Sequence, residues 1–117
     1  MNVLVIACHT DDETLGVGGT IAKHVTTGDL VTVCVVCKRA YNHQFDEAWT
    51  CEEKKIAARA ADTLGCDDIR FLDLPEESID QRLLDVIIPL EKIVVDVNPS
   101  VVYTHHRGDS NQDHRTV

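Results

Sequence analysis

The chain has 117 residues, 44% of them hydrophobic, and carries a formal net charge of −9 at pH 7. This length suits one domain with a hydrophobic core, and the acidic charge argues against a nucleic-acid partner, since phosphate binding requires a basic face. No apolar run approaches the roughly 18 residues of a membrane-spanning helix, so we expect no integral membrane segment.

Apolar runs of strand length alternate with stretches of helical periodicity along the whole chain. The predicted strands are residues 2–8, 30–36, 69–72 and 101–103. The predicted helices are residues 15–25 closed by Gly28, residues 46–64 stopped by Gly65, and residues 80–94 capped by Asp80 and kinked at Pro89. Polar loops are expected at residues 38–46 and after residue 103, and Leu74-Pro75 is expected to break the third strand.

This alternation predicts an α/β fold, namely a Rossmann-like three-layer arrangement with a mostly parallel sheet and right-handed crossovers. We expect one domain over residues 1–117, with the sheet stopping after the fourth strand. Ligands of such sheets bind beyond the carboxyl ends of the strands, where the strand order reverses. We expect that reversal between the first and fourth strands, and the loops after these two strands are the chemically richest.

The loop after the first strand holds four titratable groups in five residues, at His9, Asp11, Asp12 and Glu13. One interpretation is a helix cap followed by an acidic first turn, which is stabilising by itself. One cap needs only one acceptor, however, and the remaining carboxylates repel one another. A cation would remove that conflict, and the spacing of His9 and Asp12 lets a tight turn bring both to one Zn²⁺.

The loop after the fourth strand offers a third ligand. It contains His105, His106 and His114 together with two aspartates within ten residues. A catalytic zinc site usually has three protein ligands and one position open for water, which becomes a nucleophile near neutral pH. His9, Asp12 and one of these histidines would complete such a site.

The two segments, HTDDETLG and HHRGDSNQDH, resemble the motifs of the LmbE-like (PIG-L) zinc-dependent N-acetylglucosamine deacetylase superfamily. That family carries His-Pro-Asp-Asp-Glu followed by Gly, and later His-x-x-His or a close variant. Thr10 stands here in place of the usual Pro. The resemblance covers essentially the whole chain, which would correspond to the N-terminal portion of the family's fold.

The resemblance implies a zinc-dependent hydrolase that removes the acetyl group from an N-acetylated amino sugar or its conjugate. Its Zn²⁺ ligands would be His9, Asp12 and His114, and Asp11 would be the general base that takes a proton from the metal-activated water. The small-molecule amino sugar is then the expected partner. The alternative is a catalytically inactive or incomplete remnant that binds metal or sugar with the same fold.

Two further residues of the second segment gain roles from the same resemblance. Asn111 stands where many members carry a histidine, and its amide would donate to the oxyanion. Asp113 would orient the neighbouring loop or a histidine, as carboxylates behind metal ligands do. Unpaired strand edges make a homo-oligomer a further expectation.

The five cysteines show no regular disulfide framework, which favours a reducing cytoplasmic location over a secreted one. Cys34-Val-Val-Cys37 has metal-binding spacing, but it lies in a predicted strand, where residues three apart point to opposite faces. We therefore expect a structural role for this pair. Cys8 adjoins His9, and a small buried side chain is the expectation for it.

Three polar side chains in the loop after the second strand, Arg39, Tyr41 and His43, share the edge of the predicted site. They are expected either to contact polar groups of a substrate or to be merely exposed. His24 is predicted to be a surface residue of the first helix.

Overall fold

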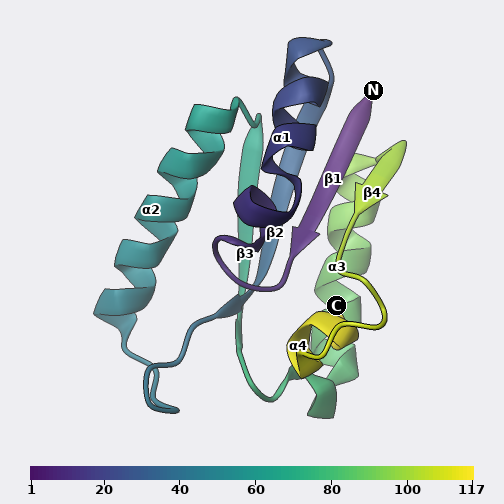
Figure 1. The fold of residues 1–117 in the computed structure, drawn as a ribbon. Coiled ribbons are helices and arrows are strands. Elements are labelled where there is room, and N and C mark those ends of the chain that lie inside the picture. Colours follow the sequence, from purple (N-terminus) through teal and green to yellow (C-terminus); the bar gives the residue numbers. More distant parts are fainter.

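The computed structural model describes residues 1–117 and contains one sheet of four parallel strands. The strands are β1 (Asn2–Ala7), β2 (Leu30–Lys38), β3 (Asp68–Pro75) and β4 (Val101–Tyr103). Their order across the sheet is β3-β2-β1-β4, so the chain moves outward from β1 in one direction and then returns to the other side of β1 (Figure 1). The predicted α/β fold and its reversal between the first and fourth strands are confirmed.

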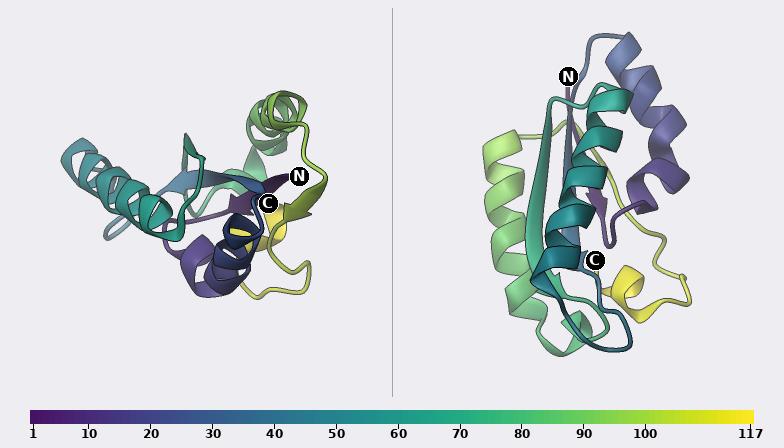
Figure 2. Two further views of the ribbon diagram at one scale, coloured as in Figure 1. Left: turned by 90° about the horizontal axis from the view of Figure 1, so that it is seen from above. Right: turned by 90° about the vertical axis from the view of Figure 1, so that its left-hand side faces the viewer.

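The helices form a layer on each face of the sheet (Figure 2). The elements are α1 (Asp12–Thr26), α2 (Glu47–Leu64), the 3₁₀ turn η1 (Ile79–Gln81), α3 (Leu83–Val97) and the short α4 (Gln112–Thr116). Helices α1 and α2 cover one face, α3 covers the other, and α4 lies beyond the carboxyl end of β1 (Figure 1). None of these helices combines the length and the apolarity that crossing a membrane would require.

The core is divided between the two faces because successive strand residues point to opposite sides. In β1, Val3 and Val5 pack with Ile21 of α1, whereas Leu4 packs on the α3 side with Val86 and its neighbours. Burial of each such side chain stabilises the fold by about 1.5–3 kcal/mol. The sheet is therefore anchored on both faces, and its carboxyl edge is a rigid platform for the loops.

Strand β3 is longer than predicted, and the expected break at Leu74-Pro75 is wrong. Leu74 pairs with Cys37, and Pro75 pairs with Lys38. A shift of register between Val35 and Cys37 keeps the two strands together up to this point. Pro75 is tolerated because it ends the strand, where a missing backbone donor costs little.

The helix boundaries were predicted with mixed success. Gly65 ends α2 with a left-handed φ of 82°, as expected. Helix α1 ends at Thr26, slightly before Gly28, whose φ of 87° turns the chain toward β2. The predicted cap at Asp80 is wrong: Asp80 lies inside η1, and α3 begins at Leu83. The 3₁₀ turn η1 precedes the helix because Ile79, its first residue, is buried in the core.

The end of the chain is not wholly a loop, contrary to the prediction for residues after 103. Helix α4 forms because the Asn111 side chain accepts hydrogen bonds from the backbone N–H groups of Asp113 and His114. In α3, Pro89 lies within a helix that continues on both sides of it.

Candidate metal centre

Three side chains from distant parts of the chain meet beyond the carboxyl ends of β1 and β4. His9 follows β1, Asp12 begins α1, and His114 lies in α4. His9 Nδ1 is 3.2 Å from His114 Nε2 and 3.5 Å from Asp12 Oδ2, and His114 Nε2 is 3.1 Å from the same oxygen. Bonds of 2.0–2.2 Å at tetrahedral angles separate the ligands of Zn²⁺ by about 3.3–3.6 Å. The donor set and its spacing therefore fit one face of a zinc tetrahedron.

In the turn before α1, the side chains of Asp11 and Asp12 do not cap the helix. Asp11 occupies the cap position with a left-handed φ of 98°, but its side chain makes no capping hydrogen bond. The Asp11 N–H is satisfied instead by Glu13 Oε2 at 3.1 Å, and Asp12 Oδ2 accepts from the His9 N–H at 2.8 Å. Glu13 is buried, and burial raises the pKa of its carboxyl group. The interpretation of these carboxylates as helix caps thus fails for Asp11 and Asp12.

The electrostatics of this turn favour a cation beside His9. Burial alone would lower the pKa of the His9 imidazole, but hydrogen bonds to Asp12 and Asp113 outweigh it and raise that pKa to about 9. Burial likewise opposes ionisation of Asp12, yet the hydrogen bonds from His9 prevail and lower the pKa of its carboxyl group. A bound metal ion would supply the positive charge in place of the proton.

The structure distinguishes the three candidate histidines of the last loop. His114 Nδ1 lies 3.1 Å from Asp109 Oδ2, which leaves Nε2 to face His9 and Asp12. His105 Nε2 is 3.5 Å from Asp12 Oδ2 but already accepts a hydrogen bond from the Cys8 N–H at 2.8 Å. His106 is exposed, and its Nδ1 accepts from a backbone N–H in its own loop. His114 is therefore the histidine placed to complete the ligand set.

Asp113 contacts His9 at Nε2, whereas His114 and Asp12 contact the other ring nitrogen, Nδ1. Asp113 Oδ2 is 3.2 Å from His9 Nε2 and accepts from the Glu77 N–H at 2.8 Å. Such a carboxylate–imidazole pair fixes the tautomer and the orientation of a ligating histidine. Asn111 caps α4 through its side-chain oxygen, so only its NH₂ group is left to donate.

A cleft of about 540 Å³ opens next to Asp11. Arg39 lines it and donates to Asp11 Oδ1 at 2.9 Å and to the Thr10 carbonyl at 2.8 Å. Tyr41 donates to Glu53, another residue of the cleft wall. Of the three polar residues expected at this edge, Arg39 thus lines the cleft directly.

His43 and His24 lie elsewhere. His43 is exposed and pairs with Glu77 at 2.7 Å. The prediction of a surface position for His24 is wrong, because its ring is half-buried between Asp29 at 2.7 Å and the Tyr103 hydroxyl at 3.0 Å. This ring connects the end of α1 to β4.

Two carboxylates at the centre were not singled out from the sequence. Asp109 lies in the polar loop already recognised, and its pairing with His114 appears only in three dimensions. Glu76 Oε2 lies 3.2 Å from His9 Nε2. Its position immediately after β3, at the same edge of the sheet, is a signal that could have identified it.

The family model described as PIG-L, GlcNAc-PI de-N-acetylase, matches residues 4–117. An uncharacterized deacetylase, YaiS, of Escherichia coli is 30% identical over 98% of this chain, which spans 63% of the length of that protein.

Solved structures show the same fold. The N,N'-diacetylchitobiose deacetylase from Pyrococcus horikoshii aligns with a TM-score of 0.82 at 27% identity, over 97% of this chain and 45% of its own. The 4-carboxy-2-hydroxymuconate hydratase GalB from Pseudomonas putida aligns with a TM-score of 0.81 at 24% identity, over 97% of this chain and 51% of its own. The second likeness bears on the fold alone. The chain thus spans about half the length of these solved proteins.

Proposed function

The chain belongs to the PIG-L family of GlcNAc-PI de-N-acetylases, and from this premise we propose that it hydrolyses the acetamide group of a small N-acetylated amino sugar. The convergence of His9, Asp12 and His114 with zinc-like spacing is the observation that supports this proposal. These residues would hold a Zn²⁺ ion, which when bound polarises a carbonyl group and lowers the pKa of a coordinated water. The products would be acetate and a free amine.

Asp11 is the proposed general base. It lies between the two ligands His9 and Asp12 in the chain, and its left-handed backbone is an unusual conformation of the kind that clusters at functional sites. The hydrogen bond from Arg39 holds the carboxylate in the wall of the cleft. In this role Asp11 takes a proton from the attacking water and delivers it to the departing nitrogen. Asn111 would donate to the developing oxyanion through its amide NH₂.

The cleft beside Asp11 supports a sugar-sized substrate. Its volume of about 540 Å³ lies within the range of small-molecule sites, which is about 300–1,000 Å³. The family description and the diacetylchitobiose deacetylase both name N-acetylated amino sugars. All five cysteines are free, which fits a reducing compartment such as the cytoplasm.

The decisive experiment measures amine release from N-acetylglucosamine and N,N'-diacetylchitobiose by the zinc-loaded chain and by Asp11→Asn. Asparagine tolerates the left-handed backbone and cannot accept the proton, so the rate should fall by about 10²–10⁴-fold while bound zinc is unchanged. Zinc binding without any amine release would favour the alternative of an inactive metal- or sugar-binding remnant. Absence of zinc from the folded chain at excess zinc would refute the hydrolase.

A further inference from the structure

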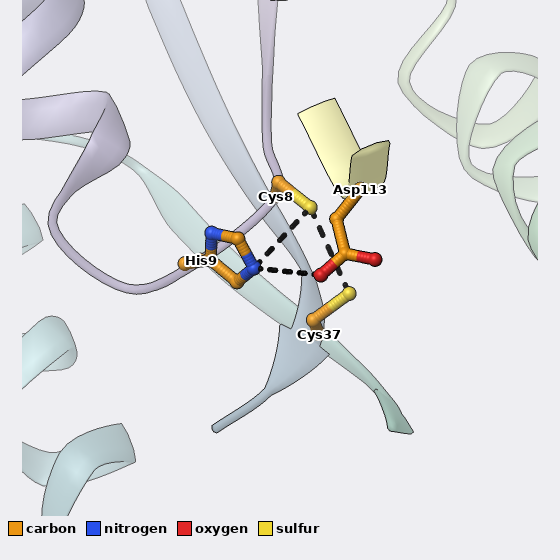
Figure 3. Close-up of side chains that lie close together, drawn as sticks. All are labelled: Cys8, His9, Cys37 and Asp113. Carbon is orange, nitrogen blue, oxygen red and sulfur yellow. Dashed lines mark hydrogen bonds and ion pairs between the residues drawn. The ribbon is translucent and has the colours of Figure 1, made fainter. Parts of the chain in front are cut away.

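A second group of metal-binding side chains lies on the other side of the His9 ring. It consists of Cys8, His9, Cys37 and Asp113, and we refer to these four residues as the thiol cluster (Figure 3). One potential ligand atom from each lies within 4.8 Å of all the others, and all four residues are buried. The cluster joins the ends of β1 and β2 to α4, whereas the centre described above contains no sulfur.

The two cysteines are held together by the sheet. The Cys37 N–H donates to the Cys8 carbonyl at 2.8 Å, which fixes the two backbones side by side. Their Sγ atoms are 3.7 Å apart. Zinc–sulfur bonds of about 2.3 Å at the tetrahedral angle place two sulfurs about 3.8 Å apart. The sulfurs thus already have the separation of a tetrahedral thiolate pair.

Two further edges of the cluster also agree with a tetrahedral cation. Cys8 Sγ lies 3.8 Å from His9 Nε2, and that nitrogen lies 3.2 Å from Asp113 Oδ2. Zinc–nitrogen and zinc–oxygen bonds of about 2.0–2.2 Å would separate such donors by about 3.6 Å and about 3.4 Å.

An unsatisfied oxygen gives an independent indication of a missing ligand. Asp113 is 3% exposed, and its Oδ1 is buried without a hydrogen-bond partner. The other oxygen is already engaged by the Glu77 N–H and by His9. Burying a carboxylate oxygen without a partner is costly, and a cation in the cluster that is bound by both oxygens of Asp113 would supply one for Oδ1.

We propose that the thiol cluster binds a thiophilic divalent cation, such as Zn²⁺ or Cd²⁺, through Cys8, Cys37, Asp113 and His9 Nε2. Binding releases the two thiol protons and any proton on Nε2 to solvent. The site shares the imidazole of His9 with the proposed hydrolytic centre, which uses Nδ1. It does not depend on the deacetylase activity and would exist in an inactive protein.

Titration of the metal-free chain with Cd²⁺ under a phosphine reductant tests the proposal. Thiolate coordination produces a near-ultraviolet charge-transfer band, and His9, Asp12 and His114 cannot produce one because they lack sulfur. We expect the band to rise to a plateau in the wild type and to disappear in Cys8→Ala and Cys37→Ala. It should persist in Asp12→Ala, in which the proposed hydrolytic centre has lost a ligand. Amine release is a separate measurement, so failure of the proposed function would leave this result intact.

Matched controls remove the other thiols. Cys34→Ala removes a buried thiol from the same strand, and Cys51→Ala removes an exposed one; both should retain the band. A folded chain without the band, or an undiminished band in Cys8→Ala and Cys37→Ala, would overturn the proposal. Should these two variants not fold, X-ray absorption of the zinc-loaded wild type decides: sulfur neighbours of zinc support the site, and their absence refutes it.

Discussion

At the scale of single residues, two carboxylate–imidazole pairs orient the ligands. Asp109 contacts Nδ1 of His114, and Asp113 contacts Nε2 of His9. Each pair leaves the opposite ring nitrogen facing Asp12. Orientation of this kind lowers the entropy that is lost when a metal binds, because the rings need not be reoriented.

The proposed assignment of the third ligand predicts the effect of His114→Ala. Removing one of three protein ligands should lower zinc affinity sharply, and Asp109→Asn, which removes only the orienting carboxylate, should lower it by about 10–100-fold. Competition with a chromogenic chelator measures both, in the Cys8→Ala background so that only one site is titrated.

His105→Asn is the control for this prediction. The Nε2 atom of His105 is engaged by the Cys8 N–H, so the substitution should leave zinc affinity nearly unchanged. Unchanged affinity in His114→Ala, together with a large loss in His105→Asn, would assign the third ligand to His105 instead.

The sequence predicted residues of the centre where spacing along the chain carries the information. His9 and Asp12 share one turn, and the polar loop containing His114 follows a neighbouring strand. The turn and the loop could therefore both be assigned to the same edge of the sheet. The contact between Cys8 and Cys37 could not be predicted, because it depends on the register of β1 against β2. The expectation that Cys34 and Cys37 point to opposite faces is wrong: both lie in the core cluster on the α3 side.

At the scale of elements, apolar runs located all four strands, because a buried parallel strand is apolar on both faces. The ends of elements were less predictable. Pro75 can end a strand or break one, and pairing with Lys38 decides between these outcomes. Asp80 has the chemistry of a cap, but burial of Ile79 moved the turn. Tertiary contacts overrode the local preference in both places.

Helix α3 contains an internal proline, which predicts a stabilising substitution. Pro89 lacks the N–H that would bond one turn back, and proline in a helix interior costs about 3 kcal/mol relative to alanine. Pro89→Ala should raise the free energy of unfolding by about 1–3 kcal/mol in urea titrations. Pro99→Ala, outside the helix, is the control and should change it little. A lower stability of Pro89→Ala would show that the helix is packed around the ring.

The buried thiol of Cys34 in β2 leads us to predict a loss of stability at high pH. Burial raises the pKa of the Cys34 thiol from 9.0 to about 12. The pKa of this thiol is higher in the folded chain than in the unfolded chain. The contribution of Cys34 to the free energy of unfolding is therefore fully present below pH 9, and it is lost as the pH rises toward 12. Between about pH 8 and about pH 10, the unfolding free energy of the wild type should fall by about 1 kcal/mol more than that of Cys34→Ala. Equal losses in urea titrations would contradict the prediction.

At the scale of the whole molecule, the centre joins the two ends of the chain. His9 follows the first strand, whereas His114 and Asp113 belong to the last helix. Helix α4 has only five residues and is too short to be stable alone. Apart from the centre, it is attached through Glu77, whose N–H donates to Asp113 and whose carbonyl accepts from Gln112, and through Val117, which packs against the core. The ordering of α4 should therefore depend on the bound metal.

This dependence predicts that zinc stabilises the fold and protects α4. At a zinc concentration of about 100 times the dissociation constant, the free energy of unfolding should rise by about 2.7 kcal/mol. Hydrogen exchange should slow most at the backbone amides of residues 112–117, because the metal ties His114 to β1. The experiment uses the Cys8→Ala background, so that only the three-ligand centre is filled, and His114→Ala in that background should show neither effect. Equal stabilisation with and without His114 would mean that the cation binds without involving α4.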